Sequence, residues 1–414
     1  MGLINKISFL LLGATSLFAL PSFRGFLLVH IFLMISFCFS LIELFTKAAN
    51  KKIFFNQKEL LVLSLSIVYY ASTMVGTINS QAYSGIVTSQ IFILTFLTIF
   101  IGYKISNGEL LYTFLKGFYI SALLTSVFCI IDTIYFYTNF KPLLEIILPD
   151  NLMEKANEHT FLNRQVIGNL ILYRSSGLSW DPGLTITGVV MAFIIINEDI
   201  IKIRYKKTGL IFLFLAVILS ISKTSLIALA AYIALTFLKK YKISRTQLLN
   251  IVAFSLFILF LYLGLFIDYG KSDPSNERHL KYFSSIFYFY KADFMEILFG
   301  YGYTGVGDFF NKHVDWLKES PGFIFGKNLN PESTLTNIFF YGGIIGSLFW
   351  LSTFIFSFYN GNKKIKMLLI TLLIVSFGYA INSVWFNSLY ITIVLLSLYQ
   401  SPGRVETKLL HQSS

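Results

Sequence analysis

The sequence predicts an all-α membrane protein with about twelve transmembrane helices and two large loops on the outer face. Three observations lead to this fold class. The chain of 414 residues is 55% hydrophobic and only 13% charged, whereas soluble domains carry roughly 25% charged residues. Apolar runs of ~20 residues, the length that crosses the hydrocarbon core, recur from one end of the chain to the other. Because these runs are continuous rather than alternating, we expect helices.

The position of each predicted span follows from the apolar runs. The run 208–238 is too long for one span, because at about 1.5 Å per residue it would overshoot a ~30 Å core by half. We therefore expect two short helices that meet at Ser222-Lys223. The first run lacks a convincing cleavage signal and is expected to be a retained span. The predicted spans are 6–21, 25–45, 60–78, 84–103, 114–137, 183–197, 208–222, 224–238, 247–267, 333–358, 366–382 and 385–400.

The distribution of basic residues predicts the orientation of the chain. With both termini in the cytoplasm, 20 of the 33 Lys and Arg residues fall at the termini or in inner loops, and the short outer loops hold only Arg24 and Lys223. This asymmetry is the one that bacterial inner-membrane proteins follow. It also explains the net charge of +12 without nucleic-acid binding, which we do not expect. We expect one integral membrane domain over 1–414.

Two long segments, 138–182 and 268–332, form the predicted periplasmic loops. Transporters usually keep loops short and place polar groups within the helices, and this chain does the reverse. The main charges inside predicted spans are Glu43 and Asp132, for which we expect structural roles. The long loops therefore become the predicted location of the functional site.

The first loop ends in basic residues that suit an anionic ligand. Arg164 and Arg174 precede Asp181-Pro182, which opens a predicted span. Asp181 suits a helix N-cap and Pro182 a first helical position, so a capping role for Asp181 stays open. Arginine presents a planar fork that grips phosphate in two places. A solvated loop stays open as the alternative for the two arginines. Lys223 lies at the outer turn between two short helices, where it either faces an anion or only adjoins Ser and Thr residues that cap the helix ends.

The second loop carries Glu277-Arg278 and a glycine-rich stretch, Phe299–Gly307. These glycines do not follow a strand in the nucleotide-binding pattern, so we expect them to let the backbone turn tightly against a neighbour. The small residues of 342–346 are expected to permit close helix contact. Glu332 lies at the entrance of the next span, where it either favours the helix dipole or acts as a general base.

No metal or cofactor is expected. His159, His279 and His313 have no second His or Cys at ligand spacing, which a zinc site would require. Cys38 and Cys129 lie inside apolar segments and are interpreted as small core residues.

Several short motifs occur in one order between residues 164 and 350, and on the same predicted face. They are Arg174-x-x-Gly177-x-x-x-Asp181-Pro182, Ser222-Lys223, Glu277-Arg278, Gly300-x-Gly302, and Thr334-Leu335 leading to Gly343-Ile-Ile-Gly346. This order resembles the O-antigen polymerase and O-antigen ligase superfamily of bacterial surface-polysaccharide assembly. The resemblance implies a membrane-embedded glycosyltransferase of GT-C-like type. It also implies action at the periplasmic face on glycans carried by undecaprenyl diphosphate, without metal.

The resemblance implies a role for each candidate residue. Arg164, Arg174 and Lys223 would bind the diphosphate, and Arg278 would stabilise the leaving group as its charge grows. Glu332 would be the base, with Asp181 in the same catalytic set. A membrane lipid carrier is the implied partner, together with a chain-length regulator and a flippase.

One departure from the family separates its two activities. Ligases of the superfamily usually show a His-Asn pair some eleven residues before the Gly-Ile-Ile-Gly element, and here Glu332-Ser333 stands at that distance. This favours a repeat-unit polymerase, for O-antigen or capsule, over a ligase that transfers finished polymer to an acceptor. A lipid-linked oligosaccharide flippase remains the alternative from another class.

Overall fold

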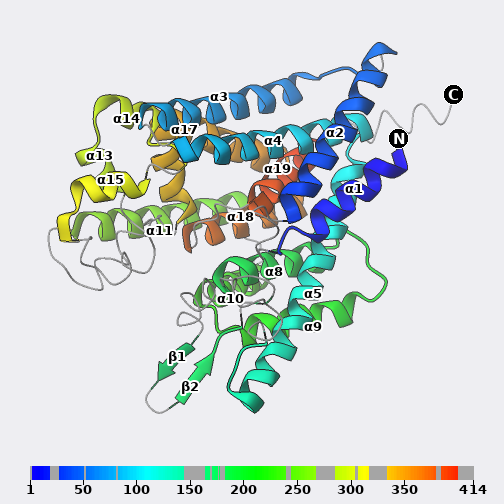
Figure 1. Cartoon of the computed structure of the whole chain (residues 1–414), viewed down its shortest axis with the longest axis vertical. Coiled ribbons are helices and arrows are strands. Elements are labelled where there is room, and N and C mark those ends of the chain that lie inside the picture. Colours follow the sequence, from blue (N-terminus) through cyan, green and yellow to red (C-terminus); the bar gives the residue numbers. More distant parts are fainter. Residues whose placement is uncertain are drawn as a thin grey trace. The chain divides into compact units, whose positions relative to one another are not determined.

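In the computed structural model, the described residues lie mostly in helices (Figure 1). The residues that it describes are 2–18, 28–50, 53–80, 83–143, 164–167, 170–175, 177, 182–238, 244–266, 285–303, 306–316, 333–378 and 384–399. The predicted site residues Asp181, Arg278 and Glu332 lie outside the described residues.

Five helices are long and apolar enough to cross a membrane. They coincide with five of the predicted spans, and none carries more than two charged residues in its most apolar 18-residue window. The longest has 31 residues, which at about 1.5 Å per residue exceeds a ~30 Å hydrocarbon core. These helices are α2 (Leu28–Ala49), α3 (Gln57–Asn79), α4 (Tyr83–Ser106), α5 (Glu109–Asn139) and α17 (Thr334–Asn360).

Each of the other predicted spans also coincides with a helix. Whether each crosses the membrane stays a prediction. They are α1 (Gly2–Ala14), α8 (Pro182–Asn197), α9 (Lys206–Leu219), α10 (Lys223–Leu238), α11 (Arg245–Phe266), α18 (Lys363–Gly378) and α19 (Val384–Tyr399).

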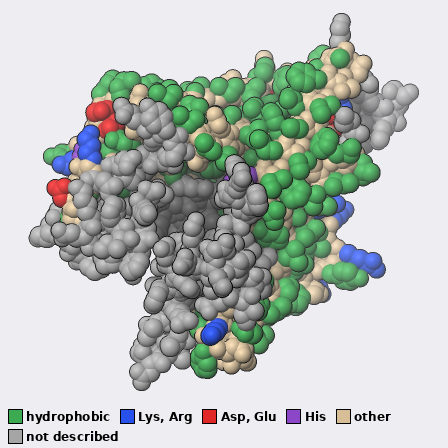
Figure 2. Space-filling view, viewed as in Figure 1, with side chains coloured by type: hydrophobic (Ala, Val, Ile, Leu, Met, Phe, Trp, Pro, Cys, Tyr) green, Lys and Arg blue, Asp and Glu red, His purple; other side chains and the backbone are tan. Residues whose placement is uncertain are grey.

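Large apolar side chains are exposed along the long helices, as expected of surfaces that meet lipid. On α2, Ile31, Met34, Ile35 and Ile42 are exposed at helical spacing, so they share one face. Figure 2 shows hydrophobic side chains over much of the described surface on one face, with charged side chains gathered in few places.

The break predicted within 208–238 is confirmed. Helix α9 ends at Leu219 and α10 begins at Lys223, and Ile221 between them has φ +49°. A left-handed residue stops the helical hydrogen-bond pattern. The Ser220 hydroxyl donates to the Val217 carbonyl at 2.9 Å and accepts from the Ser222 amide at 3.4 Å.

The described residues form two compact units. That these two units join into one integral membrane domain stays a prediction. Unit 1 contains Met1–Lys51, Leu97–Tyr241 and Ser383–Leu389, and unit 2 contains Lys52–Phe96, Lys242–Asn382 and Tyr390–Ser414.

Unit 1 is built around the crossing of α1 and α5. A Cβ on Gly13 would overlap the Phe114 carbonyl oxygen, and one on Gly117 would overlap the Leu10 carbonyl oxygen. Two glycines therefore let the backbones of α1 and α5 touch, which is how small residues permit close packing of membrane helices. Helices α8 and α9 pack against α5, and α10 packs against α8.

Glu43, near the end of α2, was predicted to have a structural role, and its contacts agree with this role. The Glu43 carboxyl forms an ion pair with Lys47 at 2.8 Å and accepts a hydrogen bond from the Asn5 side chain at 2.5 Å. The Lys47 ammonium also donates to the Ile105 carbonyl. Together, Glu43 and Lys47 thus connect α1 and α2 to the end of α4 that belongs to unit 1.

Unit 2 is centred on α3 and α17, which lie side by side. Between α11 and α17 the described chain includes three short helices from the second predicted loop, α13 (Ser285–Lys291), α14 (Phe294–Phe299) and α15 (Val306–His313). Helix α14 starts with a capping box, in which Asp293 and Glu296 each accept the other's backbone N–H at 2.9 Å.

The first predicted loop contains the exception to the helical fold. Strands β1 (Arg164–Ile167) and β2 (Leu170–Tyr173) pair antiparallel as a small hairpin (Figure 1). Its four-residue strands are separated by Gly168-Asn169 in the sequence, which is a two-residue hairpin signal.

Candidate functional site

The hairpin brings the first two predicted site residues together. Its register pairs Arg164 with Tyr173, so the backbone of Arg164 lies opposite the residue that precedes Arg174. Directly opposed residues of an antiparallel pair have Cα atoms about 4.5–5.5 Å apart. Two arginines ten positions apart along the chain therefore start from neighbouring points of the backbone.

A buried carboxyl group holds the segment that carries Arg174. Asp132 in α5 is fully buried, and its Oδ2 accepts hydrogen bonds from the Tyr173 hydroxyl at 2.7 Å and the Ser175 hydroxyl at 2.5 Å. Its Oδ1 accepts from the Leu143 backbone N–H at 2.8 Å. Asp132 thus ties residues at both ends of the 138–182 loop to one helix. Its contacts are structural, as expected.

Close packing against α5 adds to this anchorage on both sides of Arg174. The rings of Tyr173 and Phe136 stack, with centroids 4.1 Å apart and planes 9° apart. Gly177 has φ +66°, and a Cβ there would lie 2.6 Å from the Thr125 Cγ2 atom and 3.2 Å from the Cys129 sulfur. Only glycine suits this backbone and this close approach. The 173–177 segment is therefore held at defined points, with half-buried Arg174 among them.

Two helices begin at the same end of unit 1. The Thr187 hydroxyl in α8 lies 3.3 Å from the Ser225 hydroxyl in α10, and both hydroxyls are buried. Because Thr187 is in the second turn of α8 and Ser225 in the first turn of α10, the two N-termini are close together. Pro182 is the first residue of α8, as the sequence predicted. Lys223, predicted to lie in the turn between two helices, is the first residue of α10.

Two helix N-termini favour an anion at this end of unit 1. A helix N-terminus carries roughly half a positive charge and four backbone N–H groups without helical acceptors. Lys223 is the first residue of one of these helices. Arg174 lies eight residues before the other helix. The arrangement can hold an anion of phosphate type, because helix N-termini and arginine forks both suit phosphate oxygens.

The remaining predicted site residues adjoin described elements. Asp181 directly precedes α8, and Glu332 directly precedes Ser333, which is the N-cap position of α17. Arg278 precedes α13 by seven residues. Their roles stay predictions, since these three residues are outside the described part of the chain.

The glycine-rich stretch that begins at Phe299 packs closely against α17 in unit 2, as predicted. Gly343 lies in a kink of α17 with φ +59° and ψ −158°, and a Cβ there would lie 2.5 Å from the Leu298 carbonyl group. The Tyr301 amide donates to the Phe340 carbonyl at 2.5 Å, and the Ser72 hydroxyl donates to the Gly342 carbonyl at 2.7 Å. The carbonyls near the kink thus find partners outside the α17 ladder, as a broken helix requires.

One loop histidine of unit 2 is described. Partial burial and the nearby Lys312 lower the pKa of His313, and Glu296 opposes this shift. Its ring contacts that of Phe309, with centroids 4.6 Å apart. Within the described ranges, no group of three or more His, Cys, Asp or Glu residues could hold a metal ion.

Sequence reasoning missed the residues that position Arg174. Tyr173 and Ser175 flank it directly, yet nothing in their own spacing pointed to a carboxyl group some forty residues earlier. The available signal for the hairpin was Gly168-Asn169 between two short runs that contain β-branched and aromatic residues.

Comparison with known proteins finds no relative: no protein-family model and no curated protein sequence matches this chain. The fold and the long apolar helices define a helical membrane protein.

Proposed function

We propose that this protein is a polymerase of lipid-linked oligosaccharide repeat units, acting at the periplasmic face of the bacterial inner membrane. It transfers the growing glycan from undecaprenyl diphosphate onto a new lipid-linked unit. The product is an O-antigen, a capsule or a similar surface polysaccharide. Both termini of the chain lie in the cytoplasm, and about twelve helices span the bilayer.

The observation that supports this proposal is the end of unit 1 at which helices α8 and α10 begin. The hairpin register and the Asp132 hydrogen bonds hold Arg164 and Arg174 near each other, and the N-termini of α8 and α10 begin at one end of the unit. A lipid diphosphate carries the charge and the oxygen geometry that such a group of donors binds. The positive-inside rule independently assigns this end to the outer face.

The reaction needs one bond to break and one to form. The bond between the anomeric carbon of the growing glycan and the diphosphate oxygen breaks, and its electron pair remains on the diphosphate. A hydroxyl oxygen of the acceptor sugar bonds to that carbon, and its proton passes to a base. Arg164, Arg174, Lys223 and Arg278 stabilise the charge that develops on the diphosphate. Glu332 accepts the proton.

Asp181 has a positioning role in this scheme. It directly precedes Pro182, the first residue of α8, where a carboxylate that caps the helix would keep its N-terminal N–H groups oriented. No metal takes part, because arginines supply the positive charge that the leaving group needs.

The first experiment deletes the gene and compares surface polysaccharide on a gel with the lipid-linked pool. A single repeat unit on the acceptor, with the long ladder lost, is the result expected of a polymerase. Long chains that accumulate on the lipid carrier would instead mean a ligase. Unpolymerised units that remain on the cytoplasmic side would mean a flippase.

Point variants then test the assigned residues in the deletion strain. Glu332→Gln should abolish chain extension at unchanged protein level, because an amide does not accept the proton. Glu109→Gln is the matched control, since the Glu109 carboxylate is exposed and pairs with Lys6 at 3.2 Å. An active Glu332→Gln variant would refute the base assignment.

Arg174→Lys tests the diphosphate assignment separately. It keeps the charge and loses the planar fork, so we expect at least roughly ten-fold slower extension. Arg245→Lys, at the first residue of α11, is the control and should leave extension unchanged. Equal rates in both variants would show that Arg174 does not bind the diphosphate in two places.

A further inference from the structure

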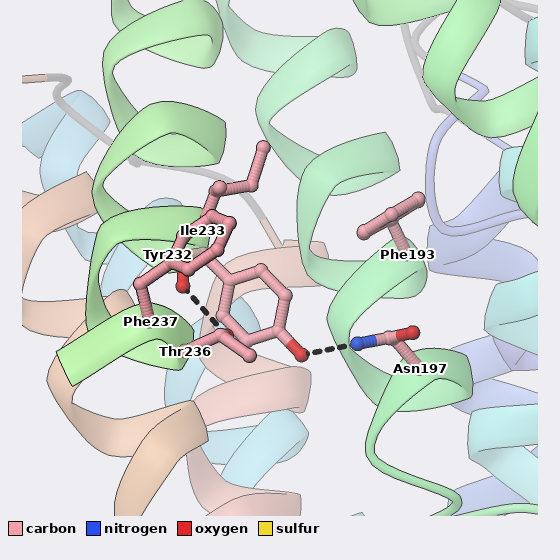
Figure 3. A pocket seen from close by; sticks show the side chains of 6 residues that line it. All are labelled: Phe193, Asn197, Tyr232, Ile233, Thr236 and Phe237. Atoms are coloured by element: carbon pink, nitrogen blue, oxygen red, sulfur yellow. Dashed lines mark hydrogen bonds between the residues drawn. The ribbon is translucent and has the colours of Figure 1, made fainter. Parts of the chain in front are cut away.

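A small cavity opens between α8 and α10, near the last turns of both helices (Figure 3). Its volume is about 210 Å³. Figure 3 shows side chains of α8 on one side and of α10 on the other. They are Phe193, Asn197, Tyr232, Ile233, Thr236 and Phe237.

The two hydroxyl groups that line this cavity, those of Tyr232 and Thr236, already have hydrogen-bond partners. The Tyr232 hydroxyl accepts a hydrogen bond from the Asn197 side chain at 2.6 Å and donates to the Glu198 carboxylate at 2.8 Å. The Thr236 hydroxyl donates to the Tyr232 carbonyl at 2.8 Å. What the cavity offers a ligand is therefore its apolar lining, chiefly Phe193 and Ile233.

Size and exposure limit the ligand to an apolar chain. Pockets for drug-sized ligands have volumes of roughly 300–1,000 Å³, which is larger than this cavity of about 210 Å³. A sugar would also leave its hydroxyls without partners among these side chains. Ile233 and Phe237 are 39% and 58% exposed on an apolar helix, so the cavity is open on a surface suited to lipid.

A basic loop adjoins the cavity. It connects α8 to α9 and starts directly after Asn197. Lys202 and Arg204 in this loop are exposed, as is Lys207 in the first turn of α9. The Lys206 ammonium donates to the Asn197 carbonyl at 3.2 Å and to Asp199 at 2.6 Å. These bonds bring the loop back to a residue that lines the cavity. The sequence places the same loop on the cytoplasmic side, where anionic lipid headgroups attract basic residues.

We propose that this cavity binds one acyl chain of an anionic phospholipid, whose phosphate is bound by Lys202, Arg204 and Lys207. The apolar lining selects the chain and the exposed cations select the negative headgroup. This site lies at the opposite ends of α8 and α10 from the proposed diphosphate site, and it does not depend on the proposed activity.

The test measures lipids retained by the purified full-length protein in native mass spectrometry. The protein is delipidated in detergent and incubated with an equal mixture of phosphatidylglycerol and phosphatidylcholine. We expect phosphatidylglycerol to be retained roughly ten-fold over phosphatidylcholine. Equal retention of the two lipids would refute the proposed headgroup contact.

Two variants separate the acyl chain from the headgroup. Thr236→Phe fills the cavity and should abolish lipid retention. Thr113→Phe is the matched control, because the Thr113 hydroxyl likewise bonds the carbonyl four residues earlier, at 3.2 Å, but does not line the cavity. The triple variant K202Q/R204Q/K207Q, altered only at exposed positions, should remove the preference for phosphatidylglycerol.

Three results would overturn the proposal. Wild-type retention in Thr236→Phe would exclude the cavity as the acyl site. An unchanged preference in the triple variant would exclude the basic loop as the phosphate site. A dimer that Thr236→Phe dissociates, with lipid retention unaltered, would identify the cavity as a contact between two copies of the chain.

Discussion

Replacing Asp132 tests whether one buried carboxyl group holds the Arg174 segment. Asp132→Ala removes the acceptor of three hydrogen bonds, from Tyr173, Ser175 and Leu143. Leaving buried hydrogen-bond donors without their acceptor costs about 1–3 kcal/mol for each donor, so we expect a total loss of about 3 kcal/mol. Asp132→Asn keeps one carbonyl oxygen and turns the other acceptor into a donor, so we expect a smaller loss of about 1–3 kcal/mol.

The effect should be local and measurable by hydrogen exchange. In lipid nanodiscs, the backbone amides of 170–177 in Asp132→Ala should exchange about a hundred-fold faster than in the wild type, since about 1.4 kcal/mol corresponds to ten-fold. Asp132→Asn should lie between the two. The segment carries Arg174, so its opening should also slow any reaction that depends on this side chain.

Asp199→Ala provides the control for the loss of a carboxylate. Asp199 pairs with Lys206 at 2.6 Å, but its side chain is 59% exposed, and exposed pairs contribute at most about 1 kcal/mol. The 170–177 amides should exchange at the wild-type rate in this variant. Wild-type exchange of these amides in Asp132→Ala would refute the idea that Asp132 anchors the loop.

Two further predictions concern unit 2. Gly343→Ala should lower the unfolding free energy by about 3 kcal/mol or more, because φ +59° with ψ −158° suits only glycine and a Cβ would meet the Leu298 carbonyl at 2.5 Å. Gly346→Ala, whose nearest new contact would be at 3.4 Å, should change it by less than about 1 kcal/mol in thermal unfolding; equal losses would contradict the close-contact argument. The folded state lowers the pKa of His313, so its contribution to stability should be fully present above about pH 6.5 and be lost as the pH drops below that value and through the lower pKa of the folded state. Unfolding midpoints at acidic and neutral pH should differ more in the wild type than in His313→Gln, and an identical pH dependence would exclude this contribution.

Much of the helical organisation could be predicted because its causes are local. Hydropathy over one span reports whether a helix can be buried in lipid, and it needs no knowledge of neighbours. The break at Ser222-Lys223 could be predicted for the same reason, since length alone excluded a single span over 208–238. The tight turns of the glycine-rich stretch were expected from the residue type.

The candidate site was less accessible to sequence reasoning. Arg164 and Arg174 were selected for their charge, but their proximity depends on a strand register that pairs Arg164 with Tyr173. The anchoring carboxyl of Asp132 comes from a helix more than forty residues earlier in the chain than Tyr173 and Ser175. Contacts of this kind depend on how distant segments pack, which no local pattern encodes.

By itself the sequence determined the helical class and the positions of the long apolar helices, because each depends on the interaction of a local stretch with lipid or water. Only the tertiary structure decided which backbones touch. It placed Gly343 against Leu298 and the 173–177 segment against α5. Close packing and buried hydrogen bonds require partners from separate parts of the chain, so their positions are set only when the helices pack.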